Sequence, residues 1–505
     1  MTPALALSAI PWLVGAPVLG AAMAFVAGRN HAAKVAAVAI VMIAIVTVPM
    51  VWLVWDRGSF ELAIGGWQAP LGIALAGDGL SATLIATTTL VCSAISIYAA
   101  GYLPRQHQTD PVAVWRFWPL WLFLWAGINA ALLSADLFNL YIAIEIIGLS
   151  SVALVALSGG EALIAALRYA LVTFVGSLFY LLGVALLYAD YGLVDIATLS
   201  RVVELQPATG AALLVMTLGL MLKAAIAPLH FWLAPAHASA LSPISAVLSG
   251  LVVKAMFYVL LRLWIGVFPR VIEPSLAEAL GVLGVIAIVW GSLRAIVQRR
   301  LKLLVAYSTV AQLGYLLLAF PIAMHRPAGA AAWSGLVLFM VAHALAKAAM
   351  FLAVGNLQHA VGSDDLGRMR GVAGMMPTSS FALALAGIAL IGLPPSSNFI
   401  GKWLLLSGAI ATERWAYVIV IVGGSLLAAA YVFPMLAATI REPIDDERFE
   451  PAFQRSPTTM QFGAFSLAAA AVGLGLLANP VFELINKGDP FNAATAISNK
   501  PRPPP

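Results

Sequence analysis

Met221 to Trp232 reads M-L-K-A-A-I-A-P-L-H-F-W, and this stretch decides how the rest of the chain must fold. Lys223 lies inside an apolar run, and Pro228 follows five residues later. A charged ammonium at the centre of a bilayer costs about 3 kcal/mol or more. Proline breaks or kinks a helix, which a membrane tolerates only where protein or water satisfies the freed carbonyls. The stretch therefore predicts a functional site in a broken transmembrane helix. The alternative is a lysine that reaches to the membrane surface beside a packing kink.

The composition places the whole chain in a membrane. Of its 505 residues, 62% are hydrophobic and 10% are charged, which excludes an ordinary soluble protein and predicts an all-α membrane protein. The net charge of +5 comes from basic residues in short loops and inside spans, so no nucleic-acid partner is expected. The single cysteine, Cys92, excludes an internal disulfide and an iron–sulfur cluster held by cysteines of this chain alone. We expect no cofactor and no metal site, and a first apolar run that is retained as a span.

Hydropathy predicts about fourteen transmembrane helices joined by short loops, with no soluble domain. The lysines and arginines outside the spans collect on one side when the helices alternate across the membrane. Fourteen lie on that side: Arg29, Lys34, Arg105, Arg116, Arg168, Arg294, Arg299, Arg300, Lys302, Arg368, Arg370, Arg441, Arg448 and Arg455. Nine lie on the other: Arg57, Arg201, Arg262, Arg270, Arg326, Arg414, Lys487, Lys500 and Arg502. Because positive loops favour the cytoplasm, we expect a multi-pass protein of the plasma (inner) membrane with both termini outside.

Two interrupted helices indicate an internal repeat. The seventh span is interrupted at Pro228, and the twelfth at Pro394 and Pro395. Breaks five spans apart predict two five-helix repeats, spans four to eight and nine to thirteen, and the second is inverted because five is odd. Many secondary transporters have this arrangement, with their sites at the broken helices; two unrelated kinks are the alternative. The predicted divisions are 1–110 with three helices, 111–268 and 269–440 with the two repeats, and 441–505 with a cytoplasmic loop, the last helix and a disordered tail from 500 to 505.

Six ionisable side chains are predicted at bilayer depth: Glu145 in the fifth span, Lys223 in the seventh, Lys254 in the eighth, His343 and Lys347 in the eleventh, and Lys402 in the twelfth. His343 and Lys347 are four residues apart and therefore share one helix face. A carboxylate, lysines and a histidine inside a membrane are the parts of a proton relay. All four cations inside spans are lysines, which favours proton exchange because arginine does not release its proton in proteins.

Each of these residues also has a purely structural interpretation. Glu145 and Lys223 could form a structural ion pair, Lys254 could only neutralise a carboxylate, and His343 could be a satisfied core histidine. It is less plausible that all the charges in these spans lack a function than that any single one of them does. The group as a whole therefore favours a relay.

At these residues the sequence resembles the antiporter-like subunits shared by respiratory complex I, membrane-bound hydrogenases and Mrp-type cation/proton antiporters. The similarity extends from about Asp78 to Tyr431. The segments that carry it are Ala126 to Glu145, K-A-A-I-A-P-L-H-F-W-L (Lys223 to Leu233), P-I-S-A-V-L-S-G-L-V-V-K (Pro243 to Lys254), Leu301 to Tyr315, H-A-L-A-K-A-A-M-F (His343 to Phe351) and F-I-G-K-W (Phe399 to Trp403). Together they are highly specific for this superfamily.

The resemblance implies a role for most of the predicted relay residues. Glu145 is similar to the fifth-span glutamate that pairs with the seventh-span lysine, here Lys223. Lys254 and His343 match central positions, and Lys402 matches the twelfth-span lysine at the outer exit. The relay would run from a cytoplasmic entry near the broken seventh helix, through Lys254 and the His343/Lys347 face, to Lys402.

The D-L-F-N-L segment from Asp136 to Leu140, and lysine at position 402, resemble the D subunit of Mrp antiporters. The resemblance thus implies a proton-carrying subunit of a sodium or potassium/proton antiporter. Such a subunit is part of a transporter rather than an enzyme. Its expected partners are the other membrane subunits of the antiporter. A proton-pumping module of a redox complex is the second hypothesis, and a scaffold with relict charges is the third. Neighbouring genes for several small membrane subunits would favour the first, and quinone or nickel–iron subunits the second.

Three positions depart from the family pattern. Trp232-Leu233-Ala234-Pro235 moves the usual W-L-P proline by one residue. Arg300 stands where an acidic residue usually precedes Lys302 by two, and Asn398 replaces a common glycine. None of them removes a predicted relay residue, but they leave open the branch of the superfamily to which the chain belongs.

Overall fold

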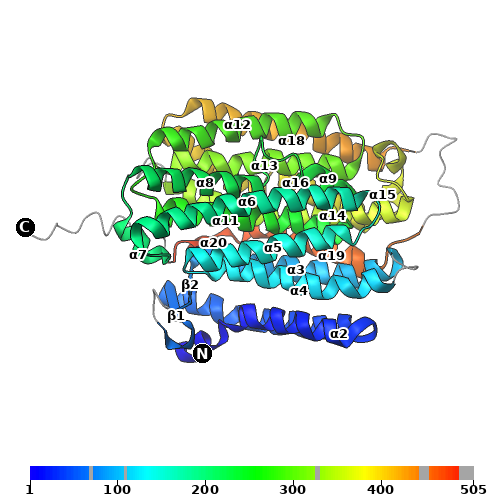
Figure 1. Cartoon of the computed structure of the whole chain (residues 1–505). Coiled ribbons are helices and arrows are strands. Elements are labelled where there is room, and N and C mark those ends of the chain that lie inside the picture. Colours follow the sequence, from blue (N-terminus) through cyan, green and yellow to red (C-terminus); the bar gives the residue numbers. More distant parts are fainter. Residues whose placement is uncertain (68–71, 107–110, 325–329, 443–453, 488–505) are drawn as a thin grey trace, which may run out of the picture.

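A bundle of long helices lying side by side makes up most of the molecule (Figure 1). The computed structural model describes residues 1–67, 72–106, 111–324, 330–442 and 454–487. One end of the bundle carries a hairpin of strands β1 (Ser59–Ala63) and β2 (Ala74–Asp78) and helix α7 (Ile196–Val202); we call it the α7 end. The opposite end carries α15 (Val372–Met375), and we call it the α15 end. The predicted all-α membrane class is confirmed.

The remaining helices follow in chain order. They are α1 (Pro3–Ala9), α2 (Trp12–Arg57), η1 (Ile64–Gly66), α3 (Gly79–Gln106), α4 (Pro111–Leu133), α5 (Leu137–Ala156), α6 (Glu161–Tyr191), α8 (Pro207–Lys223), α9 (Leu233–Ser239), α10 (Ser242–Val247), η2 (Leu248–Val252), α11 (Val253–Arg262), η3 (Leu263–Val267), α12 (Pro274–Ile296), α13 (Leu301–Ala323), α14 (Ala330–Val361), η4 (Leu366–Met369), α16 (Pro377–Ile391), α17 (Ser397–Ala411), α18 (Trp415–Ile440), α19 (Thr458–Leu476) and α20 (Ala478–Ile485).

The number of spans depends on how interrupted helices are counted. In the described ranges, 11 helical runs are long and apolar enough to cross a membrane. The first of these runs contains α2, which bends back at Gly28, where φ is 63°; a Cβ added at Gly20 would lie 2.6 Å from the Ala39 Cβ across the bend. The helices α8 and α16 are too short to cross alone, and each continues after a break in α9 or α17. Counting α2 as two spans and each broken pair as one would give fourteen, which stays a prediction.

The two repeats carry the same backbone connection at opposite ends of the bundle. At the α7 end, Asp136 at the start of α5 forms an antiparallel bridge with Asp195, which follows α6. At the α15 end, Arg300 at the start of α13 forms the same bridge with Asp365, which follows α14. Corresponding helices therefore begin at opposite ends, as an inverted repeat requires. Two unrelated kinks do not explain this match.

The segments between spans contain more structure than the sequence predicted. The long loop from 56 to 78 contains the β1–β2 hairpin, whose register pairs Ser59 with Asp78. The loop from 191 to 208 contains α7, which begins where the Asp195 carboxylate accepts a hydrogen bond from the Thr198 N–H, as a helix N-cap does. The expected disordered tail and the loop charges Arg326, Arg448, Lys500 and Arg502 lie outside the described residues.

Candidate functional site

Glu145 and Lys223 lie close together although they are far apart in the chain. The Lys223 Nζ lies 3.5 Å from the Glu145 Oε1 and donates a 2.8 Å hydrogen bond to the Thr173 hydroxyl of α6. The Ser177 hydroxyl, one turn along α6, donates to the same Glu145 oxygen. Lys223 is buried, whereas the Glu145 side chain remains 25% exposed at the edge of the bundle. The carboxylate is therefore less enclosed than the lysine, which keeps Thr173 as a second partner.

The break in the seventh span places Lys223 at the end of α8. The helix stops at Lys223, and Ala225 adopts a positive φ of 53° before Pro228. The Trp232 indole donates to the freed carbonyl of Leu222 at 2.9 Å, so the protein itself satisfies part of the break, as a membrane interior demands. A cation at a helix C-terminus also faces the negative end of the helix dipole.

Lys254 lies two residues after the end of a π-helical segment, η2. Backbone bonds there span five residues, so the Val253 N–H donates to the Leu248 carbonyl. The Lys254 ammonium donates to the carbonyl of Ser249, toward the α15 end. The Ser249 hydroxyl in turn bonds the Thr309 hydroxyl of α13 at 2.8 Å. Such π-helical segments occur frequently at functional sites.

His343 and Lys347 lie one turn apart on α14 and are both fully buried. The Lys347 Nζ donates to the Val305 carbonyl at 2.5 Å and to the Ser308 hydroxyl at 2.6 Å, both on α13. Neither ring nitrogen of His343 has a hydrogen-bond partner among the described residues. A buried polar atom without a partner costs about 1–3 kcal/mol, and water is the usual partner for such groups. The surroundings of His343 therefore do not match a satisfied core histidine.

Lys402 binds the break in the twelfth span. Its Nζ donates to the carbonyls of Ile391 at 2.9 Å and Leu390 at 3.3 Å, which the end of α16 leaves free. It also donates to the Ser425 hydroxyl at 3.3 Å and lies 4.4 Å from the centre of the Tyr315 ring. Lys402 thus donates to free carbonyls at the break in the twelfth span, as Trp232 does at the break in the seventh.

The buried lysines differ in their counter-ions. Within the described ranges, the ion pairs are Lys223–Glu145, Arg262–Asp78, Arg300–Asp364 and Arg414–Glu278. Lys254, Lys347 and Lys402 are absent from this set, and their hydrogen bonds go to carbonyl and hydroxyl oxygens. The alternative in which Lys254 only neutralises a carboxylate therefore finds no support. Arg300, where an acidic residue was expected, forms its pair with Asp364 instead.

Two further ionisable residues belong to this interior and were missed by the sequence analysis. Lys302, counted there as a loop charge, is buried in the first turn of α13 and donates to the Ala240 carbonyl at 2.9 Å. His237 of α9 is fully buried, and neither of its ring nitrogens has a described partner. Its ring stacks on Phe351 with 4.7 Å between centroids, and the Lys347 ammonium lies 5.7 Å from the same ring. The only signal in the sequence was a histidine within an apolar segment, which is usually a core position.

Replacing His237 by phenylalanine is expected to slow proton transport by about a hundredfold or more, the range that a positioned proton-transfer group contributes. The phenyl ring keeps the stacking on Phe351 but removes both nitrogens. Transport is measured in vesicles at matched expression, with a phenylalanine at the exposed His31 as control. Normal transport by the His237 variant would show that this histidine only fills space.

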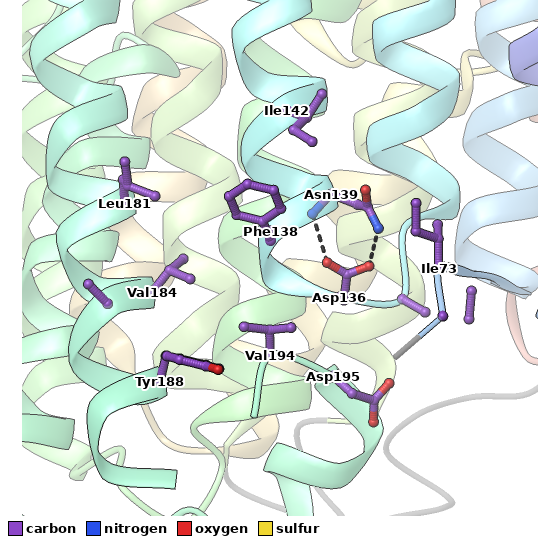
Figure 2. Close-up of a pocket in the computed structure, with 14 residues that line it drawn as sticks. Ile73, Asp136, Phe138, Asn139, Ile142, Leu181, Val184, Tyr188, Val194 and Asp195 are labelled. Atoms are coloured by element: carbon purple, nitrogen blue, oxygen red, sulfur yellow. Dashed lines mark hydrogen bonds between the residues drawn. The ribbon is translucent and has the colours of Figure 1, made fainter. Parts of the chain in front are cut away.

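A separate cavity of about 480 Å³ lies at the α7 end between α5 and α6 (Figure 2). None of the six predicted relay residues lines it. Its carboxylates are used to start helices, since Asp136 accepts from the Asn139 N–H and Asp195 from the Thr198 N–H, each at 2.7 Å. Its other lining side chains are mainly apolar, as Figure 2 shows. The cavity therefore lies apart from the candidate relay.

Comparisons with known proteins relate this chain to membrane subunits of antiporter and NADH-quinone oxidoreductase complexes. Residues 134–428 match the family model described as NADH:quinone oxidoreductase/Mrp antiporter, transmembrane. The chain is 35% identical over 378 residues to the N subunit of the NADH-quinone oxidoreductase of Desulforudis audaxviator, covering 74% of each chain. It is 28% identical over 437 residues to the D subunit of the Na(+)/H(+) antiporter of Alkalihalophilus pseudofirmus, covering 85% of each. Among solved structures, the Mrp complex from Dietzia contains a chain with a TM-score of 0.86 and 25% identity, covering 98% of this chain and 100% of that one.

Proposed function

The chain belongs to the NADH:quinone oxidoreductase/Mrp antiporter transmembrane family, and from this premise we propose that it is the proton-translocating D subunit of an Mrp-type sodium or potassium/proton antiporter. It is a multi-pass membrane protein that acts as a transporter module within a hetero-oligomeric assembly. The protons move through side chains of this chain, and the exchanged cation is a property of the whole assembly.

The observation that carries the proposal is the burial of Lys254, Lys347 and Lys402 without a described carboxylate partner. A permanently charged ammonium in such surroundings is expensive, because carbonyls and hydroxyls only partly replace its hydration. A lysine that gains and releases a proton avoids that cost during part of each cycle. Arginine at these positions would remain charged throughout.

The proposed route begins at the α15 end, which we place on the cytoplasmic side. Lys302 donates to the carbonyl at the end of α9, and His237 of α9 stacks on Phe351, whose ring also lies beside the Lys347 ammonium. From Lys254 and the His343/Lys347 face the proton passes to Lys402 at the second break. Glu145 controls the proton affinity of Lys223 by approaching it or moving away.

A second candidate function is the proton-pumping module of a redox-driven complex. The 35% identity to the N subunit of an NADH-quinone oxidoreductase favours it. In that case the redox cofactors would belong to other subunits. Purification of the intact complex and identification of its subunits separates the two: small membrane subunits alone support the antiporter, and quinone- or metal-binding subunits support the redox complex.

The isolated chain is expected to show no cation-dependent proton flux after reconstitution into liposomes. The large lateral surfaces of the bundle remain apolar; only 33% of the most apolar stretch of α18, for example, is buried by the chain itself. Neighbouring subunits that cover such surfaces complete the path. The intact complex in the same liposomes is the positive control. Robust sodium- or potassium-dependent flux from the single chain would contradict a shared path.

A further inference from the structure

A bidentate ion pair closes the α7 end of the interior beside Lys254. Arg262, the last residue of α11, donates from its two terminal nitrogens to the Asp78 carboxylate at 2.6 and 2.5 Å. Both side chains are mostly buried, and they join residues 184 positions apart in the chain. The Ser81 N–H also donates to Asp78 at 3.0 Å. The carboxylate is therefore fixed from two sides.

The charge of Asp78 persists at neutral pH. Burial alone would raise the pKa of its carboxyl, but the Arg262 charge, with hydrogen bonds from Arg262 and Ser81, holds that pKa below its ordinary value. A carboxyl whose pKa lies below its ordinary value of about 4 is ionised at neutral pH. The ion pair therefore keeps both of its charges at neutral pH.

The inner side of Arg262 faces Tyr258, one turn toward Lys254. The Arg262 Nε donates to the Tyr258 hydroxyl at 2.9 Å, and that hydroxyl donates to the Leu132 carbonyl at 2.9 Å. Lys254, Tyr258 and Arg262 follow one another at four-residue spacing on α11 and share one face, with a rise of about 6 Å between neighbours. This face therefore leads from the central lysine to the ion pair.

A small, mainly apolar cavity lies beside Lys254. It has a volume of about 10 Å³, and most of its lining side chains are apolar, among them Leu132, whose carbonyl accepts from Tyr258. Its polar lining residues are Lys254 and, from α3, Thr87 and Thr88. That volume suits about one water molecule. Lys254 and the two threonines are the polar side chains that a water molecule in this cavity would contact.

The direction of the hydrogen bonds stops a proton at Arg262. A proton moves along a chain of groups that each accept one proton and release another. The guanidinium donates inward to Tyr258 and outward to Asp78, and it neither accepts a proton nor releases one. A chain of hydrogen bonds that contains a group donating in both directions cannot carry a proton past it.

We propose that Arg262, held in place by Asp78, is a proton stop that seals the interior beside Lys254 at the α7 end and so prevents leakage of relay protons. The proposal rests on the proposed function in one respect, namely that Lys254 carries protons. Arg262 carries no proton itself. It acts by blocking proton transfer at the α7 end, so that relay protons leave the interior through Lys402.

The test is the replacement Arg262→Lys in the intact complex, in liposomes with an imposed pH gradient and choline as the only external cation. Lysine keeps the positive charge opposite Asp78 but can release its proton, so the gradient is expected to collapse several-fold faster than in the wild type. Adding Lys254→Ala should return the leak to the wild-type rate. The control is Arg414→Lys, which alters the Arg414–Glu278 ion pair, far in sequence from Lys254, and should leave the gradient stable.

The outcomes separate this proposal from the proposed function. A gradient as stable in Arg262→Lys as in the wild type overturns the proton stop, and so does a leak that persists with Lys254→Ala. If Arg262→Lys does not accumulate in the membrane, Arg262→His gives the same test, because imidazole accepts a proton at one ring nitrogen and releases one from the other. Exchange driven by sodium or potassium is measured separately on the wild-type complex, and its absence would contradict the antiporter alone.

Discussion

Glu145→Gln is expected to reduce cation-driven proton transport to background while the complex still assembles. Glutamine keeps the shape of the side chain and an oxygen that can accept from Ser177. It removes the charge that lies 3.5 Å from the Lys223 ammonium. Without that charge, the proton affinity of Lys223 no longer changes when the side chain at 145 moves, so the switch at the seventh span is lost.

A structural ion pair at this site makes a different prediction. Breaking a fully buried pair costs about 3–5 kcal/mol, because it leaves one charge unpaired. Here the Glu145 side chain is 25% exposed and Lys223 keeps its hydrogen bond to Thr173, so we expect a much smaller loss of stability. Assembly, thermal stability and transport are measured together, with Glu278→Gln at the Arg414–Glu278 pair as the control. A destabilised complex that transports at more than half the wild-type rate would contradict the relay.

Lys402→Arg is expected to stop proton transfer although it preserves the charge. The guanidinium has donors enough to bind the carbonyls of Leu390 and Ile391, as Lys402 does. It does not release its proton, since its pKa lies above about 12. If Lys402 must release its proton in each cycle, the arginine variant assembles but does not turn over.

The comparison with Lys402→Ala separates proton transfer from capping of the broken helix. A residue that only caps α16 or supplies a fixed charge predicts transport by the arginine variant and failure of the alanine variant. A relay residue predicts failure of both, with assembly better preserved in the arginine variant. The assay follows a pH gradient in everted vesicles at matched expression, with Lys34→Arg at an exposed position of α2 as control. Near-normal exchange by Lys402→Arg would remove Lys402 from the route.

The local sequence was sufficient for the helices and their breaks. Long apolar runs predict spans because a membrane interior requires every backbone group to be paired within the segment. Pro228 and Pro394 predict the breaks because proline lacks the N–H that a helix needs. The shared face of His343 and Lys347 follows from their spacing alone. The inverted order of the repeats was predicted because five helices cross the membrane an odd number of times.

The local sequence did not reveal which side chains the helices bring together. Lys302 was counted as a loop charge because it begins a helix, yet the end of α9 packs over it and buries it. His237 differs from an ordinary core histidine only through what surrounds it, namely Phe351 and Lys347 of α14. Burial of this kind depends on residues far away in the chain, so no local pattern contains it.

The sequence by itself thus determined the membrane class, the two broken helices and the family, because these depend on local composition and on contiguous motifs. Only the tertiary structure decided that Lys254, Lys347 and Lys402 are in none of the described ion pairs, and that Asp78 meets Arg262. Charge partners depend on distances of a few ångströms between helices, and the pairs here join residues 78 and 184 positions apart. Coulombic and hydrogen-bonding interactions inside a membrane are strong only at such short distances, and the packing of the whole bundle fixes them.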